Sequence, residues 1–68
     1  MTLAEARRRA GLTQDELAAK SRVDQTTISS LETGRKSSPK FITVLRLAKA
    51  LHVDPSRLTF GQSEEVTR

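Results

Sequence analysis

Apolar residues recur three and four positions apart through most of the chain, and almost no window alternates apolar with polar residues. Spacing of three and four places side chains on one face of an α-helix, whereas strict alternation is typical of a β-strand. The pattern therefore predicts an all-α fold, with helix signals at five places along the chain.

The first predicted helix runs from about Thr2 to Ala10. Leu3, Ala6 and Ala10 have the spacing that places them on one face, which we expect to be buried. Gly11 follows directly, and glycine often ends a helix because it adopts a left-handed backbone conformation without steric strain. We therefore expect the first helix to end at this point.

A capping box marks the start of the second predicted helix. Glu16 follows Thr13 by three residues, so the hydroxyl and the carboxylate can each accept a hydrogen bond from a free backbone N–H. The helix is predicted to begin at Gln14 and to end near Ser21, since Asp24 already offers a cap for the next helix. Its inward-facing residues are Leu17 and Ala18.

The third predicted helix, residues 25–32, has an unusual polar face. Ile28 and Leu31 are three residues apart and are predicted to be core, whereas the remaining surface is polar and uncharged. Thr and Ser are mediocre helix formers, so stability alone would favour Glu, Lys, Ala or Gln there. The helix is either a poorly optimised surface helix or one whose side chains contact base edges or phosphates. The residues of this face are Gln25, Thr26, Thr27, Ser29 and Ser30.

Ser38 and Pro39 predict the start of a fourth helix, with the serine as its cap and the proline in its first turn. The apolar positions that follow keep the spacing of three and four, so we expect this helix to form the main wall of the core. They are Phe41, Val44, Leu45, Ala48 and Leu51, with Leu47 beside them. Asp54 and Pro55 repeat the pattern of cap and proline and predict a fifth, short helix.

Composition narrows the class of protein. A chain of 68 residues forms one domain at most, which we place at residues 1–60. Residues 61–68 are polar except for Val66 and are predicted to form a flexible tail. Cysteine is absent, which excludes disulfides and thiolate metal ligands. Since no apolar stretch approaches the roughly 20 residues of a membrane span and no apolar leader opens the chain, we expect a cytoplasmic location.

Positive charge is concentrated in the body of the chain. Residues 1–60 hold 11 Lys and Arg against six Asp and Glu, and residues 33–40 hold three Lys and Arg and no acid. Such a segment suits a phosphate backbone or another anionic surface. A run of three cations is also common in a solvated loop, so this segment alone does not decide the function.

The second and third predicted helices are short, lie about three residues apart and share one apolar set. This arrangement predicts a compact, angled pair in which the first helix props the second outward, a helix-turn-helix. Ala18 is small where we expect the two helices to cross, because a larger side chain there would push them apart. The apolar set is Leu17, Ala18, Val23, Ile28 and Leu31.

The same region resembles the phage-repressor and Cro-like (XRE) helix-turn-helix family. The matching residues are GLTQDELAAK at 11–20, then Val23, TIS at 27–29, Leu31, Glu32 and Gly34. The likeness extends over residues 3–60, since the later LAKAL and DPSRL stretches look like that family's fourth and fifth helices. The resemblance implies a compact five-helix, lambda-repressor-like fold. It also implies a sequence-specific transcriptional regulator of double-stranded DNA, with repression by a dimer on a palindromic operator as the expected mode.

This resemblance assigns DNA contacts by position. The third helix would face the major groove, where a glutamine can pair with two atoms of adenine and a threonine methyl can meet that of thymine. We therefore expect a preference for A·T pairs under Gln25. The implied base-reading residues are Gln25, Thr26, Thr27 and Ser30, and the implied phosphate contacts are Gln14, Arg22, Arg35, Lys36 and Lys40.

The chain departs from the family pattern at two glycine positions. Arg22 stands in the turn, so either it accepts left-handed strain while its guanidinium reaches a phosphate, or the turn has another shape. His52 stands at a helix end and, as the sole histidine, is expected to have a structural or solvated role. Arg7 and Glu32 match positions that form an ion pair in some family members, and two independent surface charges are the alternative.

Other functions find less support in the residues. We see no nucleophile with its base and no pair of acids with separate roles, so we expect no enzyme, and neither metal nor cofactor. Two phenylalanines are too few to stack single-stranded bases, and Phe41 is assigned to the core.

The main alternative is a protein-interaction module of the same fold, such as an antitoxin.

A single module offers a small DNA footprint, so we expect a homodimer with half-sites about 34 Å apart. Leu58 and Phe60 are the candidate interface residues, although core packing is also expected for Leu58.

Overall fold

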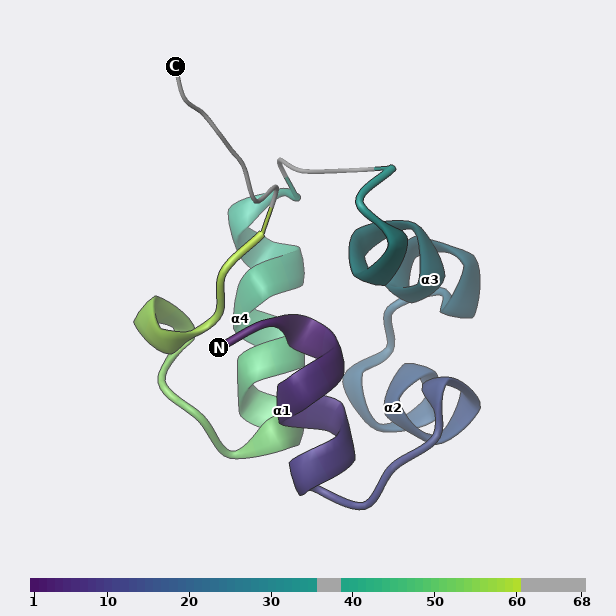
Figure 1. The fold of residues 1–68 in the computed structure, drawn as a ribbon, viewed down its shortest axis with the longest axis horizontal. Coiled ribbons are helices and arrows are strands. Elements are labelled where there is room, and N and C mark those ends of the chain that lie inside the picture. Colours follow the sequence, from purple (N-terminus) through teal and green to yellow (C-terminus); the bar gives the residue numbers. More distant parts are fainter. Residues whose placement is uncertain (36–38, 61–68) are drawn as a thin grey trace.

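The computed structural model describes residues 1–35 and 39–60. In this part of the chain, four α-helices precede one short 3-10 helix (Figure 1). They are α1 (Leu3–Arg9), α2 (Gln14–Ser21), α3 (Gln25–Thr33), α4 (Phe41–Leu51) and η1 (Pro55–Arg57). The predicted all-α fold is confirmed, and the fifth predicted helix is a single 3-10 turn.

Capping boxes set the start of both N-terminal helices. In the predicted box, Thr13 Oγ1 accepts from the backbone N–H of Glu16 at 3.1 Å, and Glu16 Oε1 accepts from that of Thr13 at 2.8 Å. Thr2 and Glu5 form a second box, so Thr2 is the cap of α1 rather than its first residue. The predicted burial of Ala10 is wrong, because this residue is the exposed C-cap of α1.

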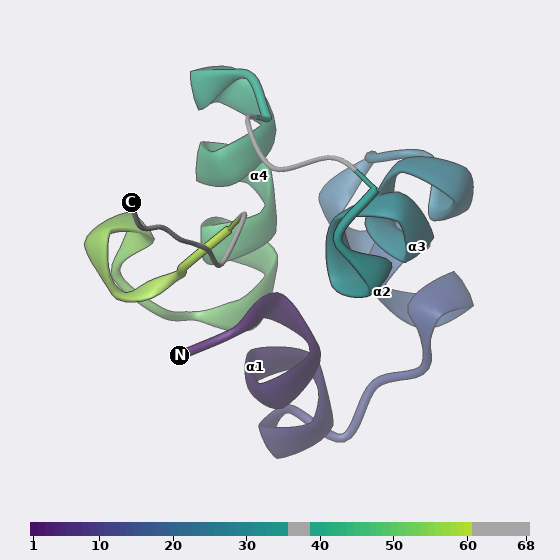
Figure 2. The ribbon, with the colours of Figure 1, turned by 45° about the horizontal axis from the view of Figure 1, so that its top comes forward.

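The core lies where α4 meets the other elements. In Figures 1 and 2, α4 stands beside α1 and η1 on one side of the molecule, and α2 and α3 form the other side. α4 packs against α2 and η1, while α3 packs against α1 and α2. The buried apolar residues are Leu3, Ala6, Leu17, Val23, Ile28, Leu31, Leu47, Ala48, Leu51 and Leu58, and Ala18 packs against them partly buried.

The segment that follows η1 lies beside the first residues of the chain, just before α1. The backbone N–H of Thr59 donates to the carbonyl of Met1 at 2.8 Å, and the Thr59 hydroxyl donates to the same oxygen at 3.1 Å. An isolated parallel bridge pairs Thr2 with Thr59. These contacts place the residues before α1 beside the residues that follow η1.

The first turn of α4 differs from the prediction. The helix begins at Phe41 with Lys40 as its N-cap, so Pro39 precedes the helix, and the predicted cap Ser38 lies outside the described residues. Phe41 was expected in the core but is 73 % exposed, and Ile42 is 52 % exposed. Burial increases along α4 toward its last turns, where Leu47 and Leu51 are buried. Periodicity identifies the face of a helix that turns inward but not how far along its axis the core extends.

The predicted tail, residues 61–68, lies outside the described residues. Within residues 1–35 and 39–60, no helix has both the length and the apolar character needed to cross a membrane.

Candidate nucleic-acid interface

The turn between α2 and α3 is built around Arg22 and Ser21. Arg22 is the C-cap of α2 and adopts the left-handed conformation with φ 62° and ψ 33°, so the backbone strain considered above is present. The buried hydroxyl of Ser21 donates to the carbonyl of Leu17 at 2.7 Å and accepts from the N–H of Val23 at 3.3 Å. These contacts, together with burial of the Val23 side chain, hold α3 at a defined angle to α2.

The two faces of α3 are sharply different. Ile28 and Leu31 are 0 % and 6 % exposed, whereas Gln25 and Thr26 are exposed at the start of the helix. The outer face lines a shallow hollow, and its residues are Gln25, Thr26, Ser29, Ser30, Thr33 and Arg35. Three of the four predicted base-reading residues therefore share one surface. Thr27, the fourth, is half-buried and does not line this hollow.

A chain of hydrogen bonds runs from the start of α3 to α2, back to the end of α3 and on to α1. Gln25 Nε2 donates to Gln14 Oε1 at 2.7 Å, and Gln14 Nε2 donates to Glu32 Oε1 at 3.1 Å. Glu32 in turn accepts two bonds from the Arg7 guanidinium, at 2.7 Å from Nε and 3.0 Å from Nη2. We call these four residues the glutamine network. The predicted Arg7–Glu32 ion pair is confirmed.

The ion pair at the base of the network is well shielded from water. The side chains of Arg7 and Glu32 are 14 % and 8 % exposed, and the third guanidinium nitrogen of Arg7, Nη1, donates to the carbonyl of Leu12 at 2.9 Å. Burial favours the neutral form of Glu32, but hydrogen bonds from Arg7 and Gln14 and nearby positive charge outweigh it and lower the pKa of this carboxyl. The hydrogen bond to Glu32 raises the pKa of Arg7. Both groups are therefore charged at neutral pH.

The glutamine network orients the side chain of Gln25, whose orientation could not be predicted from the sequence. Gln25 uses one amide hydrogen on Gln14, and the side-chain inventory of glutamine leaves a second N–H and the carbonyl oxygen for a ligand. The resemblance implied that Gln14 is a phosphate contact, but it did not imply the bonds of Gln14 to Gln25 and Glu32. Gln14 lies on α2 and both of its partners lie on α3, 11 and 18 residues further along the chain, so local spacing carries no signal for these contacts.

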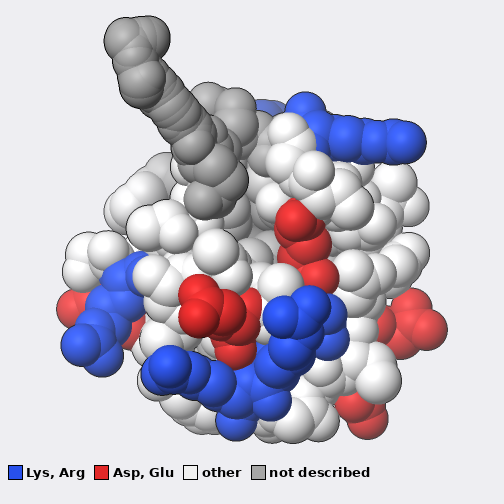
Figure 3. Space-filling view, in the orientation of Figure 1, with Lys and Arg blue, Asp and Glu red and all other residues white. Residues whose placement is uncertain are grey.

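The predicted phosphate contacts are distributed around α3. Arg35 lines the α3 hollow, and Lys40 is exposed at the start of α4. Arg22 is exposed but lines a different hollow, between α2 and α4, and Lys36 lies outside the described residues. Figure 3 shows mostly uncharged side chains over α3, with Lys and Arg at its upper edge and a second group of cations where α1 ends.

Two other predicted sites can be placed. Leu58 is 7 % exposed and belongs to the core, so its side chain offers little surface to a second copy, whereas Phe60 is only partly buried. His52 caps α4 in the left-handed conformation with φ 58°, in place of a glycine. Among residues 1–35 and 39–60, no group of three or more His, Cys, Asp or Glu side chains is placed to hold a metal ion.

Comparison with known proteins gives two matches. The helix-turn-helix family model matches residues 3–58, close to the range over which the resemblance was predicted. An uncharacterized HTH-type transcriptional regulator, y4dJ, from Sinorhizobium fredii (strain NBRC 101917 / NGR234) is 50 % identical over 58 residues, covering 85 % of this chain and 74 % of the relative. No solved structure matches significantly.

Proposed function

Because the chain belongs to the helix-turn-helix family of DNA-binding transcription regulators, we propose that it reads a specific operator through α3 and represses transcription as a dimer. Family membership confirms the Cro-like resemblance on which the sequence analysis relied. The family is a regulator type rather than a class of enzymes.

The orientation of Gln25 carries this proposal. Its side chain is held at 2.7 Å by Gln14 and retains the donor and acceptor that pair with N7 and N6 of adenine in the major groove. A side chain that is already ordered loses less conformational entropy when it binds. The α3 hollow around it is neutral apart from Arg35, so hydroxyl and amide groups rather than a strong field would meet the base edges. Thr26 and Ser30 are the other proposed base-reading residues, with Thr27 at their flank.

Phosphate contacts would flank this surface on both sides. Arg35 and Lys40 bracket the loop after α3, and Lys36 lies between them in sequence. The N-terminus of α2 at Gln14 adds backbone N–H groups and the positive end of a helix dipole. Together with Arg22, these residues would grip the strands without selecting a sequence.

A dimer follows from the small footprint of one module. Two copies related by a twofold axis would place two α3 helices about 34 Å apart, one helical turn of DNA. Phe60 is the proposed contact between copies, since it keeps exposed apolar surface. Repression requires only that the operator be occupied, which suits a chain of this size. Sedimentation as a monomer, both alone and on a palindromic duplex, would contradict the dimer.

A selection for bound duplexes tests the base contacts. The parent chain should return a palindrome with an A·T pair under Gln25, and Gln25→Ala should lose discrimination at that position by about 1 to 3 kcal/mol. Arg57→Ala, on η1, is the control and should return the parental sequence. If Gln25→Ala also returns the parental sequence, Gln25 does not read the base.

The phosphate contacts are tested by salt dependence. Each lost phosphate contact should reduce the slope of log K against log salt by about 0.9, so Lys36→Ala or Lys40→Ala should flatten the slope while the preferred sequence stays unchanged. Arg57→Ala removes the same charge elsewhere and should leave the slope as it is. A protein-interaction module of the same fold, such as an antitoxin, would instead show no salt-dependent binding to duplex DNA.

A further inference from the structure

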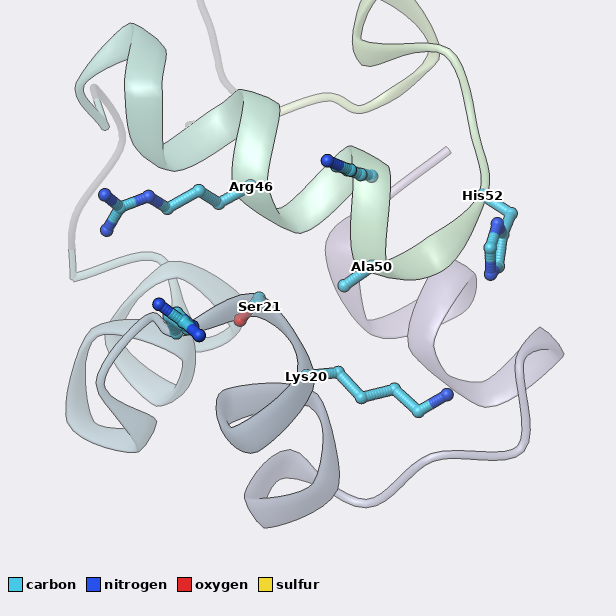
Figure 4. Close-up of a pocket in the computed structure, with 7 residues that line it drawn as sticks. Lys20, Ser21, Arg46, Ala50 and His52 are labelled. Atoms are coloured by element: carbon cyan, nitrogen blue, oxygen red, sulfur yellow. The ribbon is translucent and has the colours of Figure 1, made fainter.

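A second hollow lies between α2 and α4, apart from the α3 surface. It has a volume of about 480 Å³, and its lining residues are Lys20, Ser21, Arg22, Arg46, Lys49, Ala50 and His52. Figure 4 shows Lys20 extending from α2 toward His52, with Ala50 of α4 above it and Arg46 at the other end of the hollow. We call it the cationic hollow. It shares no lining residue with the α3 hollow.

The charge of this hollow is unbalanced. Four of its lining residues are Lys or Arg, a fifth is the sole histidine, and none of the described residues that line it is Asp or Glu. Within residues 1–35 and 39–60, the ion pair found is Arg7–Glu32, and no residue of the cationic hollow takes part in it. Like charges gathered around one concave surface repel one another and focus a positive potential into it. A bound anion would relieve that repulsion.

The backbone adds an independent observation. Four described residues have positive φ, and two of them are glycines, Gly11 and Gly34. The other two are Arg22 and His52, and both line the cationic hollow. Glycine would adopt this conformation without strain, so the chain tolerates strain at both positions and presents a basic side chain at each. Strained residues of this kind cluster at ligand sites.

Helix dipoles explain only part of this arrangement. Lys20 and Lys49 lie in the last turns of α2 and α4, where a cation complements the negative end of a helix. Arg46 lies in the interior of α4 and has no such role. The dipole also gives no reason to replace glycine at the two caps. The dipole therefore does not explain why five basic residues line one hollow.

We propose that the cationic hollow binds a small anion with two or three linked phosphate groups, of the kind carried by nucleoside di- and triphosphates. Its volume falls within the range of small-molecule pockets, about 300 to 1,000 Å³. Linked phosphates match several cations on a concave surface, and arginine can contact two oxygens at once. Because the α3 hollow is lined by other residues, the anion would lie apart from the proposed base-reading residues, and Arg22 is the one residue assigned both to the anion and to a DNA phosphate. The site thus offers the DNA-binding module a ligand-dependent control.

Titration with inorganic tripolyphosphate and with a nucleoside triphosphate, followed by amide NMR and calorimetry, tests the proposal on the full chain. Saturable binding should shift the amides of Lys20, Arg22, Lys49 and His52 more than those of α1. Arg46→Gln with Lys49→Gln should weaken binding about tenfold or more. Arg9→Gln with Arg57→Gln removes the same charge outside the hollow and should change affinity less than about twofold.

Three outcomes would overturn the site. Equal losses in the two double variants would mean that the anion responds to net charge alone. A parental affinity in Arg46→Gln with Lys49→Gln, with helicity and thermal unfolding unchanged, would mean that these side chains bind nothing. Finally, a short duplex that displaces tripolyphosphate and shifts the same amides would assign the hollow to the DNA backbone instead of a small ligand. The titrations with tripolyphosphate and with the nucleoside triphosphate contain no DNA. Their outcome therefore does not depend on whether the chain selects an operator.

Discussion

The polar surfaces at the two ends of α2 differ in how their charges are arranged. At the N-terminal end, the glutamine network joins opposite charges and neutral amides through bonds of 2.7 to 3.1 Å. At the C-terminal end, the cationic hollow gathers like charges around a cavity, with two residues in strained conformations. The first surface is stabilised within the folded chain. The second is stabilised only when something else supplies negative charge.

This difference concerns how the polar groups at the two ends of one short helix are stabilised. Groups that must present a defined hydrogen-bonding pattern are best held by the protein itself, since orientation is then established before binding. Groups that attract an anion are best left unpaired, because an internal acid would neutralise the field. Stability should therefore fall when the network is broken and rise when the hollow is relieved.

The largest expected effect comes from Arg7→Ala. It leaves the Glu32 carboxylate, which is 8 % exposed, without its cation, and should reduce the free energy of unfolding by about 3 kcal/mol in urea titrations. Arg9→Ala in the same helix is exposed and should change stability by less than about 0.5 kcal/mol. A double-mutant cycle with Glu32→Ala measures the coupling. Additive effects of the two substitutions would mean that the pair is two independent charges.

A smaller loss should accompany acidification. The pKa of Glu32 is lowered below its usual value of 4.5 in the folded chain, so its contribution is fully present above pH 4.5 and is lost as the pH falls through the folded pKa. The loss is smaller than for Arg7→Ala because a protonated Glu32 still accepts a hydrogen bond. Glu5 and Asp54, whose pKa values are lowered by bonds to backbone N–H groups, act in the same direction. Thermal unfolding from pH 7 to pH 3 should therefore depend less steeply on pH in Glu32→Gln. An unchanged slope would contradict this account.

At the cationic hollow the sign should reverse. Arg22→Gly and His52→Gly each remove left-handed strain and one basic side chain, and each should raise the free energy of unfolding by about 0.5 to 1 kcal/mol. Gly11→Ala is the converse control. A methyl group at Gly11 meets no atom within 4 Å, so its expected loss of about 1 kcal/mol reports the backbone alone. Destabilisation by both glycine substitutions would show that these side chains stabilise the fold.

The smallest effect should be a response to salt. Screening weakens repulsion among exposed charges far more than attraction within a shielded pair. Raising sodium chloride from about 0.01 M to 0.15 M should therefore stabilise the parent chain by a few tenths of a kcal/mol, and Arg46→Gln with Lys49→Gln should lose this gain. Arg9→Gln, which leaves Arg46 and Lys49 intact, should keep the gain of the parent chain. If the double variant and the single variant respond to salt alike, the repulsion is not localised in the hollow.

Much of the fold could be predicted because its signals are local. The Thr13 capping box, Gly11 and the spacing of Ile28 and Leu31 each act within one or two turns, and the structure has the corresponding helix ends and buried face. The burial of Phe41 was predicted wrongly. Phe41 has the same three-and-four spacing as the buried residues of α4. The other helices, however, do not cover the first turn of α4, where Phe41 lies.

The candidate site likewise contains contacts that could be predicted from the sequence and contacts that could not. The resemblance supplied the Arg7–Glu32 pair and the list of residues on α3, whereas the bonds of Gln14 to Gln25 and Glu32 join α2 to α3 in space. The sequence also left the conformation of Arg22 open, because the strain of a left-handed arginine is small enough for either outcome.

The amino-acid sequence by itself determined the helices, the caps at Thr13 and Asp54 and the helix-turn-helix, since each depends on interactions between residues a few positions apart. Only the tertiary structure decided which polar side chains bond to one another and which like charges gather around a cavity. Those outcomes depend on how α2 is placed between α3 and α4, which is set by packing of the core and not by spacing along the chain.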